Sequence, residues 1–323
     1  MKRIAVLTSG GDAPGMNSAI RATVRAAIAH GLEVFGIQRG YQGLIDGDIA
    51  ALNARSVSGI IHHGGTILHT ARCADFLTAA GRARAMANLQ RLGIEGMVVI
   101  GGDGSYRGAY DLWQEHGMAC VGIPGTIDND IGGTQFTIGF DTALNTAVEA
   151  IDRLRDTAAS HDRIFFVEVM GRHSGYIAMY SGVAGGAEGI LVPENVTDIS
   201  ALVASLRAVT ARGKTSMIVV VAEGDDAGNA FEIALKVAEI SEFKEARVSV
   251  LGHLQRGGTP SAFDRVLAAR MGVAAVEALM AGEANVMTVM ENNKIALKPL
   301  PEAWETRNLY DSDLFRITSL LSV

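Results

Sequence analysis

The sequence is poor in cysteine, with only Cys73 and Cys120 among 323 residues. Two cysteines cannot build a disulfide framework, and this pair lacks the close spacing of metal ligands, so we expect free thiols in a reducing compartment. Long apolar runs are also missing, and residues 1–3 lead directly into a short strand rather than into a signal peptide. A membrane-spanning helix needs about 20 consecutive apolar residues. We therefore expect a cytoplasmic protein without membrane contact.

An excess of positive charge is lacking as well. The chain has 28 Lys and Arg against 35 Asp and Glu, a formal net charge of −7 at pH 7. This balance argues against a general nucleic-acid binder, so local arginines, backbone amides or a metal ion would have to hold any anionic ligand. Prolines number six, and no Pro- or Ser-rich linker marks a domain boundary. The 48% hydrophobic content and the length are ordinary for a globular protein of two α/β domains.

One apolar run, residues 119–123, is followed at once by a hydroxyl and two carboxylates. The heptapeptide 124–130 (PGTIDND) contains Thr126, Asp128 and Asp130. Buried parallel strands end in such polar clusters where an α/β sheet presents its carboxyl edge to a ligand. Asp128 and Asp130 are therefore candidates for acid-base or metal chemistry. Taken alone, the heptapeptide suits an Asx-turn equally well, with side chains that bond their own backbone.

Glycine-rich turns follow two strands in the first half of the chain. The strand at residues 4–7 leads into TSGGDAPGMN at 8–17 and then into a helix, and the strand at 97–100 leads into GGDGS. Glycine lets backbone amides approach a phosphate, and a helix amino terminus favours negative charge. The first of these turns is neither a Walker loop nor a GxGxxG motif. We expect two adjacent anion-binding loops, with Asp103 either holding Mg²⁺ or capping the helix that follows.

The strand-then-polar pattern continues in the second half. Apolar segments at 164–169, 189–192, 217–222 and 248–251 each lead into glycine or charged residues, and helical patterns separate them. Repeated βα units predict an α/β fold with mostly parallel sheets. In the first half we expect a loop at 41–53 and a helix at 56–61.

Five ordered motifs resemble those of bacterial ATP-dependent 6-phosphofructokinases. They are residues 10–17 (GGDAPGMN), 101–105 (GGDGS), 124–130 (PGTIDND), 170–172 (MGR) and 252–258 (GHLQRGG), and the match runs from residue 1 to about 305. The resemblance implies two Rossmann-like three-layer α/β domains in a homotetramer. Residues 1–139 with about 255–305 would bind ATP, and residues 140–254 with about 306–323 would bind fructose 6-phosphate.

The resemblance also implies roles for single residues. Asp128 is similar to a general base that takes the proton of the sugar 1-hydroxyl, Thr126 and Arg172 would steady the moving phosphoryl group, and Asp130 shares this catalytic motif. The implied ATP contacts are Gly11, Arg72, Cys73, Gly102, Asp103, Gly104 and Ser105, with Asp103 also holding Mg²⁺. The implied fructose 6-phosphate contacts are Thr126, Asp128, Arg163, Met170, Gly171, Arg172, Glu223, Arg247, His253 and Arg256.

Two further features are implied for the assembly. Arg163 and Arg247 resemble arginines that reach the sugar phosphate from a neighbouring subunit. A separate effector site, at which ADP and phosphoenolpyruvate would compete, is implied by Arg21, Arg25, Arg55, Arg155, Glu188, Arg212 and Lys214. Taken alone, Arg21 and Arg25, one helical turn apart, suit a solvated helix face better.

Some positions depart from the family pattern. Leu77 stands where a basic residue near the nucleotide is usual, Gly59 replaces an acidic residue near the effector site, and the segment 225–245 is longer than usual. A pyrophosphate-dependent phosphofructokinase is one alternative; such enzymes typically carry Asp and Lys at the positions of Gly104 and Gly125, so both glycines favour ATP. A nucleotide sensor without catalysis is the other alternative, although it would not need Thr126, Asp128 and Asp103 together.

Overall fold

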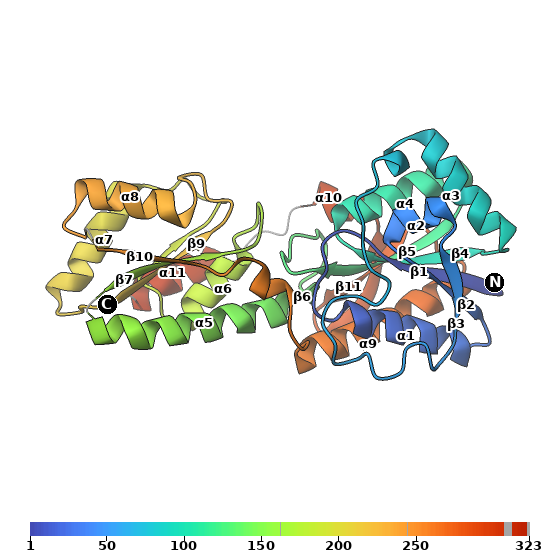
Figure 1. Ribbon diagram of the computed structural model, residues 1–323, viewed down its shortest axis with the longest axis horizontal. Helices are drawn as coiled ribbons and strands as arrows, with labels where there is room; N and C mark the ends of the chain where they lie inside the picture. Colours follow the sequence, from blue (N-terminus) through green and yellow to red (C-terminus); the bar gives the residue numbers. More distant parts are fainter. Residues whose placement is uncertain (162, 244, 307–311, 322–323) are drawn as a thin grey trace. The chain divides into compact units, whose positions relative to one another are not determined.

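The computed structural model describes residues 1–161, 163–243, 245–306 and 312–321, and it divides into two compact units. Met1–Thr142 and Arg256–Asn308 form the first unit, and Ala143–Gln255 and Leu309–Val323 form the second (Figure 1). Helix α5 (Phe140–His161) begins in the first unit and continues in the second. None of the helices in the described ranges is long and apolar enough to cross a membrane.

The first unit is built on a twisted sheet with strand order β12-β11-β5-β4-β1-β2-β3, and β6 pairs with β5. The pairs β2–β3 and β11–β12 are antiparallel and the others are parallel. The strands are β1 (Arg3–Thr8), β2 (Glu33–Ile37), β3 (Ile49–Leu52), β4 (Gly96–Gly101), β5 (Ala119–Thr126), β6 (Ile138–Gly139), β11 (Val286–Glu291) and β12 (Lys294–Pro299).

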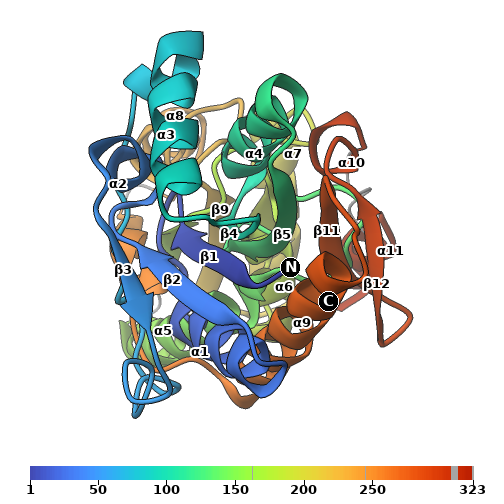
Figure 2. The same cartoon turned by 90° about the vertical axis from the view of Figure 1, so that its right-hand side faces the viewer.

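Helices cover both faces of this sheet (Figure 2). Helices α1 (Met16–Ala29) and α9 (Ala262–Met280) lie together on one face, and they approach so closely that a Cβ on Gly272 would lie 2.6 Å from the Cβ of Ala22. The other face carries α2 (Gly40–Asp46), α3 (Ala79–Arg91), α4 (Asp103–His116), α10 (Glu302–Glu305) and the 3₁₀ turn η1 (Asp75–Leu77). Strand β4 is buried throughout because it is covered on both sides.

The second unit has a four-stranded parallel sheet of order β10-β7-β9-β8. Its strands are β7 (Ile164–Val169), β8 (Gly189–Leu191), β9 (Met217–Ala222) and β10 (Arg247–Val250). Helices α7 (Ile199–Ala211) and α8 (Ala230–Ile240) cover one face, and α5 covers the other (Figure 1). Helix α6 (Tyr176–Ala184) packs on β9 and on α11 (Ser312–Leu321). The predicted α/β class with mostly parallel sheets is confirmed.

Several local predictions were wrong. Residues 56–61 form turns rather than a helix, and the segment 41–53 contains α2 and β3 rather than a loop. The long segment 225–245 holds α8, which begins with a capping box: the Asn229 side chain accepts from the amide of Glu232, and the Glu232 carboxylate accepts from the amide of Asn229. This capping box determines that α8 starts directly after Asn229, within the long segment.

Candidate active site

Three chemically active segments follow neighbouring strands of the first unit. Strand β4 lies between β1 and β5, with Thr8 opposite Ile100 and Gly101 opposite Pro124. Because these strands are parallel, the two glycine-rich loops and the heptapeptide 124–130 emerge at the same edge of the sheet. The backbone approach is close, since a Cβ on Gly101 would lie 2.4 Å from the carbonyl oxygen of Ser9.

The first loop holds an arginine from far along the chain. The Arg256 Nη1 donates to the carbonyl oxygen of Asp12 at 3.0 Å. A Cβ on Gly11 would lie 2.5 Å from that nitrogen, so the guanidinium rests directly against the glycine backbone. Gly15, with a φ of 108°, turns the chain into α1. The loop thus brings Gly11, an expected ATP contact, together with Arg256, an expected sugar phosphate contact.

The second loop opens helix α4. Gly102 precedes the helix and Asp103 is its first residue, half exposed, with one carboxylate oxygen 3.9 Å from Arg107 Nε. A Cβ on Gly104 would meet nothing within 4 Å. The buried Ser105 accepts a 2.5 Å hydrogen bond at its carbonyl oxygen from the Tyr41 hydroxyl.

The Tyr41 ring joins this loop to a second expected nucleotide segment. It stacks on Phe76 with ring centroids 4.0 Å apart, and Phe76 lies just beyond Arg72 and Cys73. Arg72 is exposed, Cys73 packs partly against the hydrophobic core, and Leu77 is 80% exposed. Burial in this core raises the pKa of Tyr41 well above its ordinary value, so the hydroxyl remains a donor. Sequence reasoning missed Tyr41, since its partner lies 64 positions away.

The heptapeptide completes β5 with residues 124–126 and turns after Thr126. Asp128 is 4% exposed, and its amide donates to Thr126 Oγ1 at 3.2 Å. Asn129 adopts a left-handed conformation, accepts from the amide of Thr137 at 2.9 Å and donates to the carbonyl of Gln135. Asp130 is exposed. The Asx-turn and the reactive-site interpretations are therefore compatible, because Asn129 supplies bonds that stabilise the turn.

Asn17 anchors the loop that leads to Arg72. Its Nδ2 donates to the carbonyls of His63 and Gly64 at 3.1 and 3.0 Å, and its Oδ1 accepts from the amide of Ile67 at 2.8 Å. These three bonds tie residues 63–67 to the amino-terminal turn of α1. The structural role of Asn17 was not predicted, although it lies within the first motif.

A magnesium ion would have to share its coordination with a ligand. Within the described ranges, no group of three or more His, Cys, Asp or Glu side chains is arranged to hold a metal. Mg²⁺ is usually bound by one or two carboxylates together with substrate phosphates. Asp103 fits that requirement, because its half-exposed carboxylate lies in the second glycine-rich loop, where phosphates are expected to bind.

In the second unit, β7 ends in a strained turn. Gly171 has a φ of 147° and Arg172 a φ of 54°, and the Glu223 carboxylate accepts from the Arg172 amide at 2.8 Å and from the Gly171 amide at 3.4 Å. A Cβ on Gly224 would lie 1.8 Å from the Arg172 carbonyl oxygen, so only glycine fits there. The turn is held by the end of the neighbouring strand β9.

His253 belongs to the same unit and lies on the 3₁₀ turn η2 (Gly252–Arg256). It is exposed, whereas Met170 is buried. Arg163 and Arg247 stand elsewhere, at the amino ends of the parallel strands β7 and β10, where Arg247 pairs with Phe165. A rise of 3.3 Å per residue puts Arg163 roughly 20 Å from Val169, the last residue of β7 before the turn. Within this unit, the structure does not bring these arginines to the other expected sugar phosphate contacts.

The expected effector residues of the second unit form a cluster. The buried Glu188 carboxylate contacts the Lys214 ammonium, lies 3.6 Å from Arg155 Nη1 and accepts from the amide of Ile218. Arg155 also donates to the carbonyls of Gly185 and Gly186. Arg212 is exposed nearby in sequence, at the end of α7. In the first unit, Arg21 and Arg25 lie on α1, Arg55 is exposed, and Gly59 faces open space.

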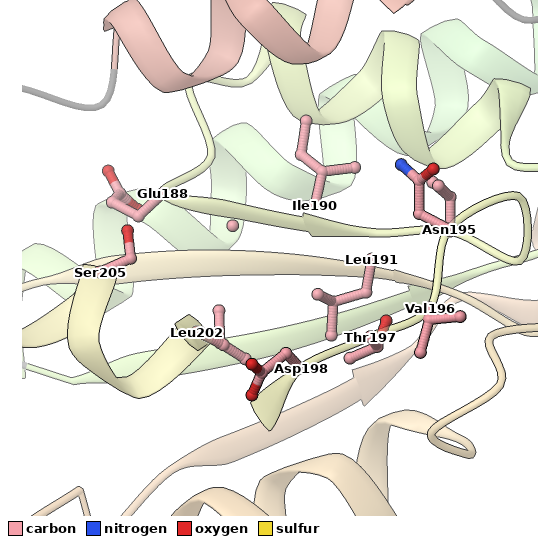
Figure 3. A pocket seen from close by; sticks show the side chains of 11 residues that line it. Glu188, Ile190, Leu191, Asn195, Val196, Thr197, Asp198, Leu202 and Ser205 are labelled. Atoms are coloured by element: carbon pink, nitrogen blue, oxygen red, sulfur yellow. The ribbon is translucent and has the colours of Figure 1, made fainter. Parts of the chain in front are cut away.

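Glu188 also lines a cavity of about 190 Å³ (Figure 3). The other walls come from β8, the segment 192–198 and α7, and they include Leu191 and Leu202. The Asp198 carboxylate caps α7 by accepting from the amides of Ser200 and Ala201, which makes that helix end unattractive to an anion. We therefore do not assign a phosphate site to this cavity.

Comparison with known proteins identifies the family. A phosphofructokinase family model matches residues 3–279. The chain belongs to the phosphofructokinase family. Members of this family are phosphotransferases, and the resemblance drawn from the five motifs is thereby confirmed.

Individual phosphofructokinases are similar over the whole chain. The ATP-dependent 6-phosphofructokinase 1 of Thermus thermophilus is 58% identical over 323 residues, and the ATP-dependent 6-phosphofructokinase of Bacillus subtilis is 55% identical, each covering 100% of both chains. The solved phosphofructokinase of Saccharomyces cerevisiae superposes with a TM-score of 0.88 at 34% identity. It covers 99% of this chain, which spans 50% of the yeast chain. A pyrophosphate-dependent phosphofructokinase from Marinobacter aquaeolei, at 22% identity and a TM-score of 0.85, shares the fold.

Proposed function

We propose that the protein transfers the γ-phosphoryl group of ATP to the 1-hydroxyl of D-fructose 6-phosphate, giving fructose 1,6-bisphosphate and ADP, the committed step of glycolysis. The observation that carries the proposal is the placement of two glycine-rich loops and the buried Asp128 at one edge of one sheet. The names of the bacterial relatives at 55–58% identity support the same substrates.

The chemistry requires a base, positioning and neutralisation of charge. Asp128 takes the proton from the sugar hydroxyl as it attacks, and Thr126, whose hydroxyl accepts from the Asp128 amide, orients the same turn. Asp103 would hold Mg²⁺, which supplies charge neutralisation to the phosphates when bound. Arg172 stabilises the negative charge that spreads over the transferred group.

The phosphate group of the sugar is a dianion, so its contacts should be cationic or hydrogen-bond donors. Arg256 and His253 supply charge-assisted hydrogen bonds, and Met170, Gly171 and Glu223 shape the rest of the site. Because Arg163 and Arg247 lie at the opposite sheet edge of their unit, we place them in the active site of a neighbouring subunit of a homotetramer.

The choice of ATP rests on two glycines. A nucleotide α-phosphate needs space and no negative charge beside Gly104, where the structure is open. At Gly125, a Cβ would lie 3.0 Å from Ile100 Cγ2 and 3.2 Å from Met16 Cε, so a lysine would require its neighbours to move. These features support a nucleotide over pyrophosphate.

Regulation and location complete the proposal. ADP would activate and phosphoenolpyruvate would inhibit through Arg21, Arg25, Arg55, Arg155, Glu188, Arg212 and Lys214. Both oxygens of Glu188 already accept or pair within the chain, so an effector-bound magnesium would have to displace Lys214. Cys73 and Cys120 are free thiols, which suits a cytoplasmic enzyme.

The test is an assay of fructose 1,6-bisphosphate formation with ATP and, separately, with pyrophosphate. We expect product with ATP, and Asp128→Asn should lower kcat by roughly 10²–10⁴, which is the usual contribution of a positioned base. The control Asp48→Asn changes an exposed aspartate of the same unit and should leave kcat unchanged. Product with pyrophosphate alone would contradict the proposal, and a fully active Asp128→Asn would remove Asp128 from its role.

A further inference from the structure

Gln255 is fully buried, and in the sequence it lies between His253 and Arg256, which are both expected to bind the sugar phosphate. His253 precedes it on the turn η2 and Arg256 follows it in the chain. The Gln255 Oε1 accepts a 2.9 Å hydrogen bond from the backbone amide of Met170, 85 positions earlier. The side chain therefore ties the turn η2 to the end of strand β7.

The orientation of the Gln255 amide is fixed by this bond. Because the Met170 N–H is a donor, the oxygen of the side chain must face it, and the nitrogen must point the other way. That Nε2 has no hydrogen-bond partner within the described ranges of the chain, and it is shielded from solvent. Burying an unpaired donor is unfavourable. Within those ranges, the hydrogen bond from the Met170 amide is the only one that this side chain makes.

The bond acts on the strained turn described above. Met170 is the first residue beyond β7, and the next two residues adopt positive φ angles with their amides on Glu223. Gln255 holds the entry to this turn and Glu223 holds its exit. The turn at 170–172 and the 3₁₀ turn of His253 consequently share one buried anchor.

We propose that Gln255 is a positioning residue of the sugar phosphate site, which holds the turn at 170–172 in register with His253. The inference rests on the proposed function and adds a residue that does not itself contact the ligand. Losing the anchor should weaken binding of fructose 6-phosphate and leave ATP binding unchanged, because the hydrogen bond of Gln255 goes to the turn at 170–172 and not to the glycine-rich loops.

The experiment compares Gln255→Met with a matched control, Ser181→Ala. Methionine fills a similar volume without the acceptor. Ser181 is equally buried in the second unit and donates to the Ile177 carbonyl at 2.6 Å, within helix α6. We expect the KM for fructose 6-phosphate to rise about 10- to 100-fold in Gln255→Met, with the KM for ATP unchanged, since small misplacements of binding groups have effects of this size. Ser181→Ala should change neither KM.

Two further measurements separate positioning from general destabilisation. Gln255→Glu retains an acceptor oxygen at the same reach and should restore most of the affinity for fructose 6-phosphate. Hydrogen exchange of a peptide spanning residues 168–172 should accelerate in Gln255→Met and not in Ser181→Ala. Should the methionine variant fail to fold, Gln255→Leu takes its place in both measurements.

The outcomes distinguish this inference from the proposed function. A wild-type protein that does not phosphorylate fructose 6-phosphate would refute both. An active wild type with an unchanged KM for fructose 6-phosphate in Gln255→Met, or with equal rises in both KM values, would refute the positioning role alone.

Discussion

At the residue scale, the buried carboxylate of Asp264 determines how α5 and α9 begin. Its oxygens accept from the amide of Gly139 at 2.8 Å, from the amide of Thr142 at 2.9 Å and from the Thr142 hydroxyl at 2.5 Å. Ser261 caps α9 by accepting from the Asp264 amide. Burial raises the pKa of Asp264 from its ordinary value of 3.8 to about 6, against the opposing effect of these hydrogen bonds.

This raised pKa predicts a pH dependence of stability. The folded state keeps the proton of Asp264 up to about pH 6 and the unfolded state only up to about 3.8, so this stabilising contribution is full below pH 3.8 and is lost as pH rises through 6. The difference corresponds to about 3 kcal/mol. The free energy of unfolding of the wild type, measured relative to Asp264→Asn in urea, should fall by about that amount between pH 4 and pH 7. A constant difference would contradict the assignment.

At the element scale, the junction between β4 and α4 affects both nucleotide binding and the stability of α4. Asp103 and Gly104 open the helix, and the space around Gly104 is open. A carboxylate in the first turn of a helix is favourable by about 0.3–1 kcal/mol. A carboxylate added at position 104 would also repel a bound phosphate. The substitution Gly104→Asp should therefore stabilise the helix and weaken ATP binding.

We therefore predict that Gly104→Asp keeps or slightly raises the melting temperature while the KM for ATP rises about 10- to 100-fold. Like charges near a protein surface at 4 Å repel by about 4 kcal/mol, which corresponds to about a 1,000-fold change in affinity, so the expected rise in KM lies below this limit. The KM for fructose 6-phosphate should not change. Gly104→Ala is the matched control, because it adds a Cβ without charge and should retain most of the ATP affinity. Equal effects of the two variants would show that size, and not charge, matters at this position.

At the scale of the whole molecule, regulation would require two states of an assembly that ligands bind with different affinity. The expected effector residues divide between the units: Arg21 and Arg25 lie on α1 of the first, whereas Lys214 and Glu188 lie in the second. Coupling energies of about 1–3 kcal/mol are typical of such sites. Because Gly59 lacks the acidic side chain that was expected near this site, we predict a coupling energy at the lower end of this range.

Steady-state assays at subsaturating fructose 6-phosphate test this regulation. ADP should activate and phosphoenolpyruvate should inhibit the wild type by about fivefold. Arg21→Ala, Arg25→Ala and Lys214→Ala should each lose both responses and keep kcat at saturating substrate. Lys214→Ala should still fold, because Glu188 retains Arg155 and the Ile218 amide. A wild type that responds to neither ligand would mean that Arg21 and Arg25 form only a solvated surface and that Lys214 serves only to pair with Glu188.

The sequence by itself determined the features that depend on short stretches of chain. Strands that end in glycine or carboxylates, such as β4 before Gly102, could be read because apolar β-branched runs and glycine turns are local properties. The alternation of strands and helices likewise predicted the α/β class. The hairpin β11–β12 had a readable signal that was missed: Asn292 and Asn293 both adopt positive φ, as a tight two-residue hairpin turn requires.

Only the tertiary structure decided which distant groups meet. Tyr41 bonds a residue 64 positions away, Gln255 one 85 positions away, and Arg256 one 244 positions away. The order of strands in a sheet sets such contacts, and a single sequence carries no record of that order. The direction of the strands separates Arg163 and Arg247 from the turn at Arg172: the two arginines lie at the amino ends of β7 and β10, and the turn follows the carboxyl end of β7. Residue types therefore indicated the chemistry, and the parallel packing of strands determined which residues share an edge.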